Sequence, residues 1–105
     1  MAGTAPIADD GTTIAVGDVR AQTRRCFEIA LGALAELGAG VDDVVRTRVM
    51  LTDVGRWRES AEAHGEVFGA VRPACTFVGV GGFIDPDWLV EVEVDAHVVD
   101  DQHVG

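Results

Sequence analysis

The sequence predicts a single α+β domain in which two helices cover one face of a mixed β-sheet. Two segments repeat apolar residues at three- and four-residue steps, as helices do, and two others alternate apolar and polar residues, as strands do. With a further short apolar run, the order is helix, strand, helix, strand, strand, which is typical of a layered α+β fold. A chain of 105 residues can form one core but not two. We therefore assign residues 1–105 to one domain, with a polar and frayed tail at residues 100–105.

The first helix is predicted from Asp18 to Leu37. Asp18 is a good N-cap, the apolar residues after it recur at helical spacing, and Gly38 suits a left-handed C-terminal cap. Residues 1–17 are rich in Gly, Thr and Asp, so we expect a loop there, with one short strand at residues 13–16.

Residues 44–51 alternate between two faces and predict a strand. One face carries Val45, Thr47, Val49 and Leu51, and the other carries Val44, Arg46, Arg48 and Met50. The strand therefore presents two arginines on one side.

A second helix is predicted next, capped by Thr52 or Asp53 and ending near Gly69. A strand follows at residues 75–80, and the turn-rich residues 81–87 lead into the last strand. Both helices can then cover the same apolar face of the sheet.

The last strand, residues 89–98, alternates most strictly of all. Its apolar face carries Val90, Val92, Val94, Ala96 and Val98, and its polar face carries Glu91, Glu93, Asp95 and His97. Successive carboxylates lie about 6.5 to 7 Å apart at the usual strand rise, so the row is a solvated surface, a set of ion-pair partners or part of a site. The chain offers nothing to cover this face of the sheet, which favours a symmetric oligomer.

Charge and composition exclude several function classes. The formal net charge is −10, from 18 acidic and 8 basic residues, which disfavours nucleic acid and anionic membranes as partners. Cys26 and Cys75 have no CxxC spacing and are predicted to be reduced thiols of a cytoplasmic protein. Neighbouring acids on one strand cannot converge on one ion, so we predict no metal site, and we expect no cofactor.

Four stretches resemble the reactive-intermediate deaminase family, also called Rid, YjgF or endoribonuclease L-PSP. Residues 72–80 and 84–96 resemble its C-terminal signature, residues 44–54 its central strand, and residues 3–7 its N-terminal motif. The resemblance implies a chorismate-mutase-like fold, a homotrimer and a small-molecule cleft at each subunit interface. Family members usually carry a further strand pair ahead of the N-terminal motif, and we expect the sheet here to lack it.

The resemblance also implies a chemistry, because archetypal members hydrolyse enamines and imines to a keto acid and ammonia. Carried over to this chain, Glu91 would position the attacking water, while Cys75, Thr76, Phe77 and Gly3 would contact the substrate. The family's carboxylate-binding arginine falls on Cys75, and a thiol cannot form the bidentate, charge-assisted contact that an arginine forms. We therefore expect a Rid-like hydrolase with an altered substrate or, alternatively, a non-catalytic trimeric ligand-binding or stress-response module. The family's ribonuclease label fits a charge of −10 poorly.

Each candidate also has a structural interpretation. Glu91 could instead form an ion pair with Arg46 or Arg48. For Glu93 and Asp95, ion pairing with these arginines is the preferred role. His64 is expected to pack against its helical neighbours. Cys75 is read as a small cleft residue and not as a nucleophile, because nearby carboxylates would raise the pKa of its thiol.

Overall fold

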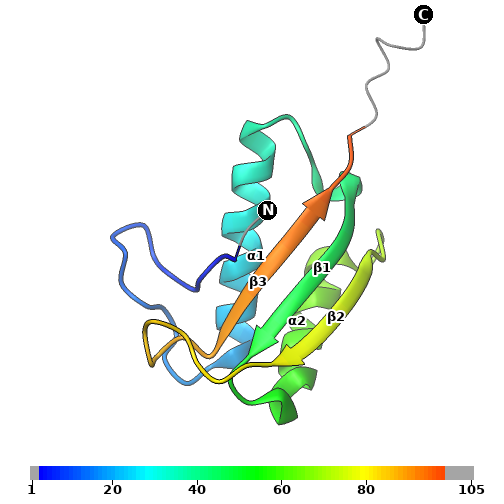
Figure 1. Cartoon of the computed structure of the whole chain (residues 1–105). Helices are drawn as coiled ribbons and strands as arrows, with labels where there is room; N and C mark the ends of the chain where they lie inside the picture. The colour runs from blue at the N-terminus through cyan, green and yellow to red at the C-terminus, as the bar shows by residue number, and fades with distance from the viewer. Residues whose placement is uncertain (1–2, 99–105) are drawn as a thin grey trace, which may run out of the picture.

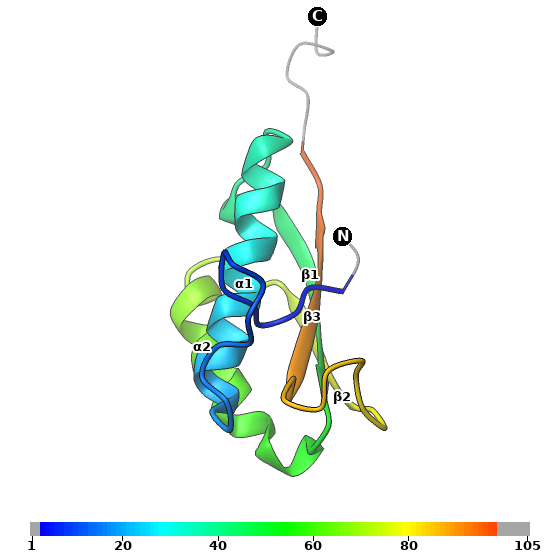
Figure 2. The ribbon, with the colours of Figure 1, turned by 90° about the vertical axis from the view of Figure 1, so that its left-hand side faces the viewer.

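A computed structural model describes residues 3–98 and has two layers, with both helices on one face of a three-stranded sheet (Figures 1 and 2). The helices are α1 (Val19–Glu36) and α2 (Trp57–Phe68). The strands are β1 (Val44–Leu51), β2 (Ala74–Gly79) and β3 (Val90–Ala96), in the spatial order β2-β1-β3. Strand β1 runs parallel to β2 and antiparallel to β3, which confirms the α+β class and the mixed sheet.

The helix ends follow their capping residues. The Asp18 carboxylate accepts a hydrogen bond from the backbone N–H of Ala21 at 3.0 Å and so begins α1. The predicted helix end at Leu37 is one residue too late, because α1 ends at Glu36 and the Leu37 side chain is 82% exposed. Asp53 does act as a cap, but of a short 3₁₀ turn (Val54–Arg56), so α2 begins only after that turn.

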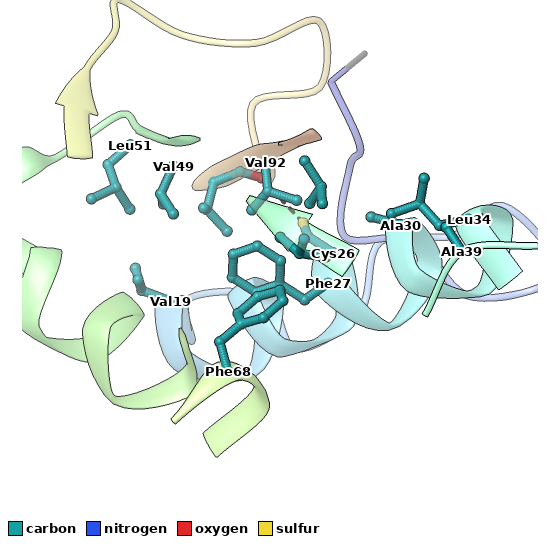
Figure 3. Close-up of a cluster of buried hydrophobic side chains, with 13 residues drawn as sticks. Val19, Cys26, Phe27, Ala30, Leu34, Ala39, Val49, Leu51, Phe68 and Val92 are labelled. Atoms are coloured by element: carbon teal, nitrogen blue, oxygen red, sulfur yellow. Dashed lines mark hydrogen bonds between the residues drawn. The ribbon is translucent and has the colours of Figure 1, made fainter. Parts of the chain in front are cut away.

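The core lies between the helices and the sheet (Figure 3). Phe27 of α1 and Phe68 of α2 meet edge to face, with ring centroids 5.0 Å apart, and both are almost fully buried. Above them, Val49 pairs with Val92 across the sheet, so the apolar face of β3 points toward the helices as predicted. Within residues 3–98, neither helix combines the length and the apolar character that crossing a bilayer requires.

One predicted face assignment in β1 is wrong at its beginning. Val44 is buried and Val45 is 52% exposed, the reverse of strict alternation. The pairing with β3 shifts between Val44 and Arg46, so Val45 is an extra residue in a β-bulge. Beyond the bulge the alternation holds, with Thr47, Val49 and Leu51 facing the helices.

The segment before α1 meets the outer edge of β3 at one bridge and then loops away from the sheet (Figure 1). Thr4 exchanges two backbone hydrogen bonds with Val92, of 2.8 and 3.1 Å. The short strand predicted at residues 13–16 does not form, and Thr13 makes only an isolated bridge to Ile7. The part of this segment that the structure describes holds single bridges and no strand. The predicted frayed tail lies outside the described residues.

Candidate functional site

Glu91 lies on the open face of β3, away from both helices. Its neighbours Val90 and Val92 are fully buried, which fixes the alternation, and it stands opposite Met50 of β1. Its side chain is partly buried, and among the residues that the structure describes it makes no ion pair and no hydrogen bond. Burial, and secondarily the charge of Glu93, raise the pKa of the Glu91 carboxyl above its ordinary value. The result is a carboxylate of increased basicity that has no partner within residues 3–98.

The other two acids of β3 have partners. Glu93 lies 3.7 Å from Arg48, and Asp95 lies 3.2 Å from Arg46. These pairs confirm the predicted structural role of both acids. They also place the two arginines that could have paired with Glu91 beside other carboxylates.

Gly3 lies directly against the Glu91 carboxylate. The Thr4–Val92 bridge brings the N-terminal segment to this edge of β3, and a Cβ built on Gly3 would stand only 2.9 Å from Glu91 Oε1. A larger residue at this position would require the end of the Glu91 side chain to move. Gly3 and the candidate water-binding acid Glu91 are therefore neighbours within one protomer.

The other predicted contact residues lie elsewhere on the sheet. Cys75 stands opposite Thr47 and Phe77 opposite Val49, so both face the helices, whereas Thr76 faces the open side opposite Arg48. Since β1 separates β2 from β3, these residues lie about two strand spacings, or about 9.5 Å, from the strand of Glu91. One protomer thus brings Gly3 to Glu91 but does not bring Cys75 or Phe77 there.

Thr76 lines a shallow hollow on the open face. The hollow has a volume of about 230 Å³, and its other lining residues are Arg46, Arg48 and Val78. The cationic groups in it already face Asp95 and Glu93, so the hollow is close to neutral.

A polar contact lies on the opposite face, under β1 and β2. The Thr47 hydroxyl is 2.9 Å from His64 Nε2, and the His64 ring packs against Phe27 and Phe68, which confirms its packing role. Burial lowers the pKa of His64. Burial also raises the pKa of the Cys75 thiol above its ordinary value, and the Thr47 hydroxyl offsets only part of this increase. The expectation that carboxylates raise this pKa is wrong, because the acids of β3 occupy the other face of the sheet.

Gln22 is a supporting residue that the sequence interpretation missed. It is fully buried in α1, its Oε1 accepts from the N–H of Leu89 at 2.9 Å, and its Nε2 donates to the carbonyl of Asp87 at 3.0 Å. These bonds fix the connection that enters β3 two residues before Glu91. The signal was its helical spacing of three from Val19 and four from Cys26, both buried.

Within the described part of the chain, no three His, Cys, Asp or Glu side chains are grouped so that they could hold a metal ion.

Comparisons with known proteins place this geometry in context. Residues 1–98 match the family model described as Endoribonuclease L-PSP. An uncharacterised protein of Streptomyces coelicolor is 44% identical over 81 residues, which cover 77% of this chain and 60% of that protein. The 3-aminoacrylate deaminase RutC of Acinetobacter baylyi is 32% identical over 98 residues, 93% of this chain and 77% of RutC. The crystal structure of a YjgF-family protein of Mycobacterium tuberculosis superposes with a TM-score of 0.82 at 43% identity, covering 93% of this chain and 76% of that one. The chain thus spans less than two thirds of the Streptomyces relative.

Proposed function

The chain belongs to the endoribonuclease L-PSP family, which includes the Rid and YjgF proteins, and from this premise we propose that it hydrolyses a small imine or enamine with Glu91 as the base. The observation that carries the proposal is the state of Glu91, a partly buried carboxylate with a raised pKa and no partner among the described residues. A base works best when its pKa approaches the working pH, and an ion-paired carboxylate would be a weaker base. The RutC relative is named for the deamination of 3-aminoacrylate, an enamine.

The chemistry needs only water and the carboxylate. Glu91 accepts a proton from water while the water oxygen bonds to the imine carbon, and the C=N electron pair moves to nitrogen. Glu91 returns this proton to the nitrogen, which gives a carbinolamine. It then takes the carbinol O–H proton and passes it to the nitrogen, which leaves as ammonia while the carbonyl forms. An enamine enters the same path after protonation at carbon gives the imine. Glu91 is regenerated, and no cofactor is consumed.

We infer an uncharged imine or enamine in preference to an anionic one. Cys75 occupies the position of the family's carboxylate-binding arginine, and losing such a charged contact costs about 1.5 to 3 kcal/mol. Phe77, beside it on the same face of β2, is in ring contact with Trp57 at 5.9 Å and offers an apolar surface. An additional negative charge on the ligand would also face the acids of β3.

We further infer that the complete site forms between copies of the chain in a cytoplasmic homotrimer. This inference is supported by the separation of Glu91 from Cys75 and Phe77 within one protomer. The open sheet face also carries both charges, in the Arg46 and Arg48 ion pairs, beside the apolar Met50. Such a mixed face suits contact with a second copy of itself.

A substrate panel tests the proposal. Imines and enamines of matched size, one series uncharged and one carboxylated, are generated in situ, and ammonia and carbonyl product are measured above spontaneous hydrolysis. We expect equal amounts of the two products and a higher kcat/KM for the uncharged series. A protein that accelerates none of these reactions would contradict the proposal.

A non-catalytic ligand-binding module is the second candidate, and the replacement of the arginine by Cys75 favours it. In that case a small ligand from the same panel raises the melting temperature without being consumed. The two functions are distinguished by measuring thermal shift and ammonia release on the same samples.

A further inference from the structure

On the open face of the sheet, three residues of β1 each stand opposite one acid of β3. The three pairs are Arg46–Asp95, Arg48–Glu93 and Met50–Glu91. In the first two, the nitrogen of the arginine lies 3.2 and 3.7 Å from the carboxylate oxygen. In the third, a thioether side chain takes the place of the cation. Glu91 is therefore the acid of this face whose opposite residue on β1 offers no charge.

The backbone does not account for the difference between the second and third pairs. Val92 directs its backbone N–H and C=O outward, to Thr4. Its neighbours along the strand, Glu91 and Glu93, therefore direct theirs toward β1, and their two pairs are of the same type. Both acids are partly buried, and the Cβ atoms of such pairs lie about 4.5 to 5.5 Å apart. An arginine at position 50 would thus reach Glu91 as Arg48 reaches Glu93.

The row of side chains that ends at Glu91 is otherwise apolar. Met50 stands opposite Val78 of β2, so this row across the three described strands holds no polar side chain besides the acid. Burial is the largest cause of the raised pKa of Glu91, the charge of Glu93 adds to it, and no arginine is among the causes. The row therefore gives Glu91 neither a counter-charge nor a hydrogen-bond donor.

We propose that Met50 is a positioning residue for the hydrolysis, and that it acts by leaving Glu91 free of an ion pair so that the carboxylate can accept a proton from water. The catalytic consequence rests on the function proposed above, whereas the effect on Glu91 itself can be measured without a substrate. An opposite charge beside a carboxylate lowers its pKa, and a carboxylate of lower pKa is a weaker base. The same pair of strands thus holds two acids in ion pairs and leaves the third available.

The test supplies the missing cation with Met50→Arg and measures the pKa of Glu91 in the native full-length protein. The side-chain carboxyl carbons of glutamate are isotope-labelled and titrated by NMR, and the spectrum of Glu91→Gln assigns the signal. In the wild-type protein we expect the pKa of Glu91 to lie above its ordinary value. In Met50→Arg we expect this pKa to be lower than in wild type by at least about 0.5.

Val78→Arg is the matched control for added charge. It places the same cation in the same row, but on β2, about two strand spacings, or about 9.5 Å, from the strand of Glu91. We expect it to lower the pKa of Glu91 by no more than about half as much as Met50→Arg does. Met50→Leu keeps the row apolar and should leave the titration unchanged. Light scattering compares the assembly of each variant with that of wild type.

Kinetics on the best substrate of the imine panel provide the second readout. Met50→Arg should lower kcat at least about tenfold with little change in KM, because the base is weakened and no substrate contact is removed. The acidic limb of its pH–rate profile should move to lower pH, together with the pKa of Glu91. A residue with a merely structural role would lower the rate without moving this limb.

Two results would overturn the inference. An equal pKa of Glu91 in Met50→Arg and wild type would show that residue 50 does not control the state of the acid. Equal lowering by Val78→Arg would show that the total charge of the face is responsible and not the opposite residue. If Met50→Arg does not fold, Met50→Gln takes its place, because an amide N–H can donate to the carboxylate and shift the pKa in the same direction. The titration needs no substrate, so its outcome is separate from that of the substrate panel.

Discussion

Replacing Gln22 with Leu should destabilise the protein and loosen the entry to β3. Leucine fits the buried space but provides no polar atoms, so the Leu89 N–H and the Asp87 carbonyl lose bonds of 2.9 and 3.0 Å. A buried polar group without a partner costs about 1–3 kcal/mol, so the two groups together cost about 2–6 kcal/mol. The added apolar burial returns about 1–2 kcal/mol. We therefore expect a net loss of about 0–5 kcal/mol, with a midpoint of about 2.5 kcal/mol, in the free energy of unfolding.

Urea unfolding of Gln22→Leu and wild type at equal protein concentration measures this loss. Arg24→Leu is the matched control, because it is the same kind of change on the same helix and removes only exposed ion pairs, with Glu66 and Glu28. Such exposed pairs contribute about 0–1 kcal/mol each. If Gln22→Leu were as stable as Arg24→Leu, the assignment of Gln22 as the residue that fixes the β3 connection would be refuted.

Two further predictions concern ionisation. Glu91→Gln should raise the melting temperature at pH 7. The pKa of Glu91 is raised in the folded protein, so its ionised form opposes folding once the pH exceeds the pKa of an ordinary glutamate. A lower melting temperature of the variant, measured by calorimetry, would contradict this. For His64 the folded pKa is lowered, so the unfolded chain binds the proton more readily and stability falls as the pH drops below about 6.5. His64→Phe should lose less stability than wild type between pH 7.5 and pH 5.5 in urea titrations, and an equal loss would show that His64 does not contribute.

The sequence predicts the layers of this fold because local signals agree with the tertiary packing. The alternation in β3 holds residue by residue, since one face packs on two helices and the other does not. The same rule fails at Val44 and Val45, where a bulge that depends on pairing with β3 inserts an extra residue. The prediction for Leu37 is wrong for a related reason. Helical spacing does not show at which residue a helix stops contacting the core, and Leu37 lies beyond that point.

The candidate site is predictable in part. Resemblance identifies Glu91 and Gly3, and their contact follows from one bridge between the N-terminal segment and β3. It does not reveal that Cys75 and Phe77 face the other side of the sheet, because the register of β2 against β1 is a property of the paired strands. The Thr47–His64 contact was equally hidden, as it joins residues on two elements whose packing no local pattern encodes.

The rate of ammonia release from the best uncharged imine, compared between Glu91→Gln and Glu93→Gln, tests the central claim most directly. Both variants remove one carboxylate from the same face of β3, but Glu93 is the one paired with Arg48. We expect Glu91→Gln to lose at least about a hundredfold in kcat, as removal of a general base does, and Glu93→Gln to keep most of its activity. Equal activity in the two variants would contradict the assignment of Glu91 as the base.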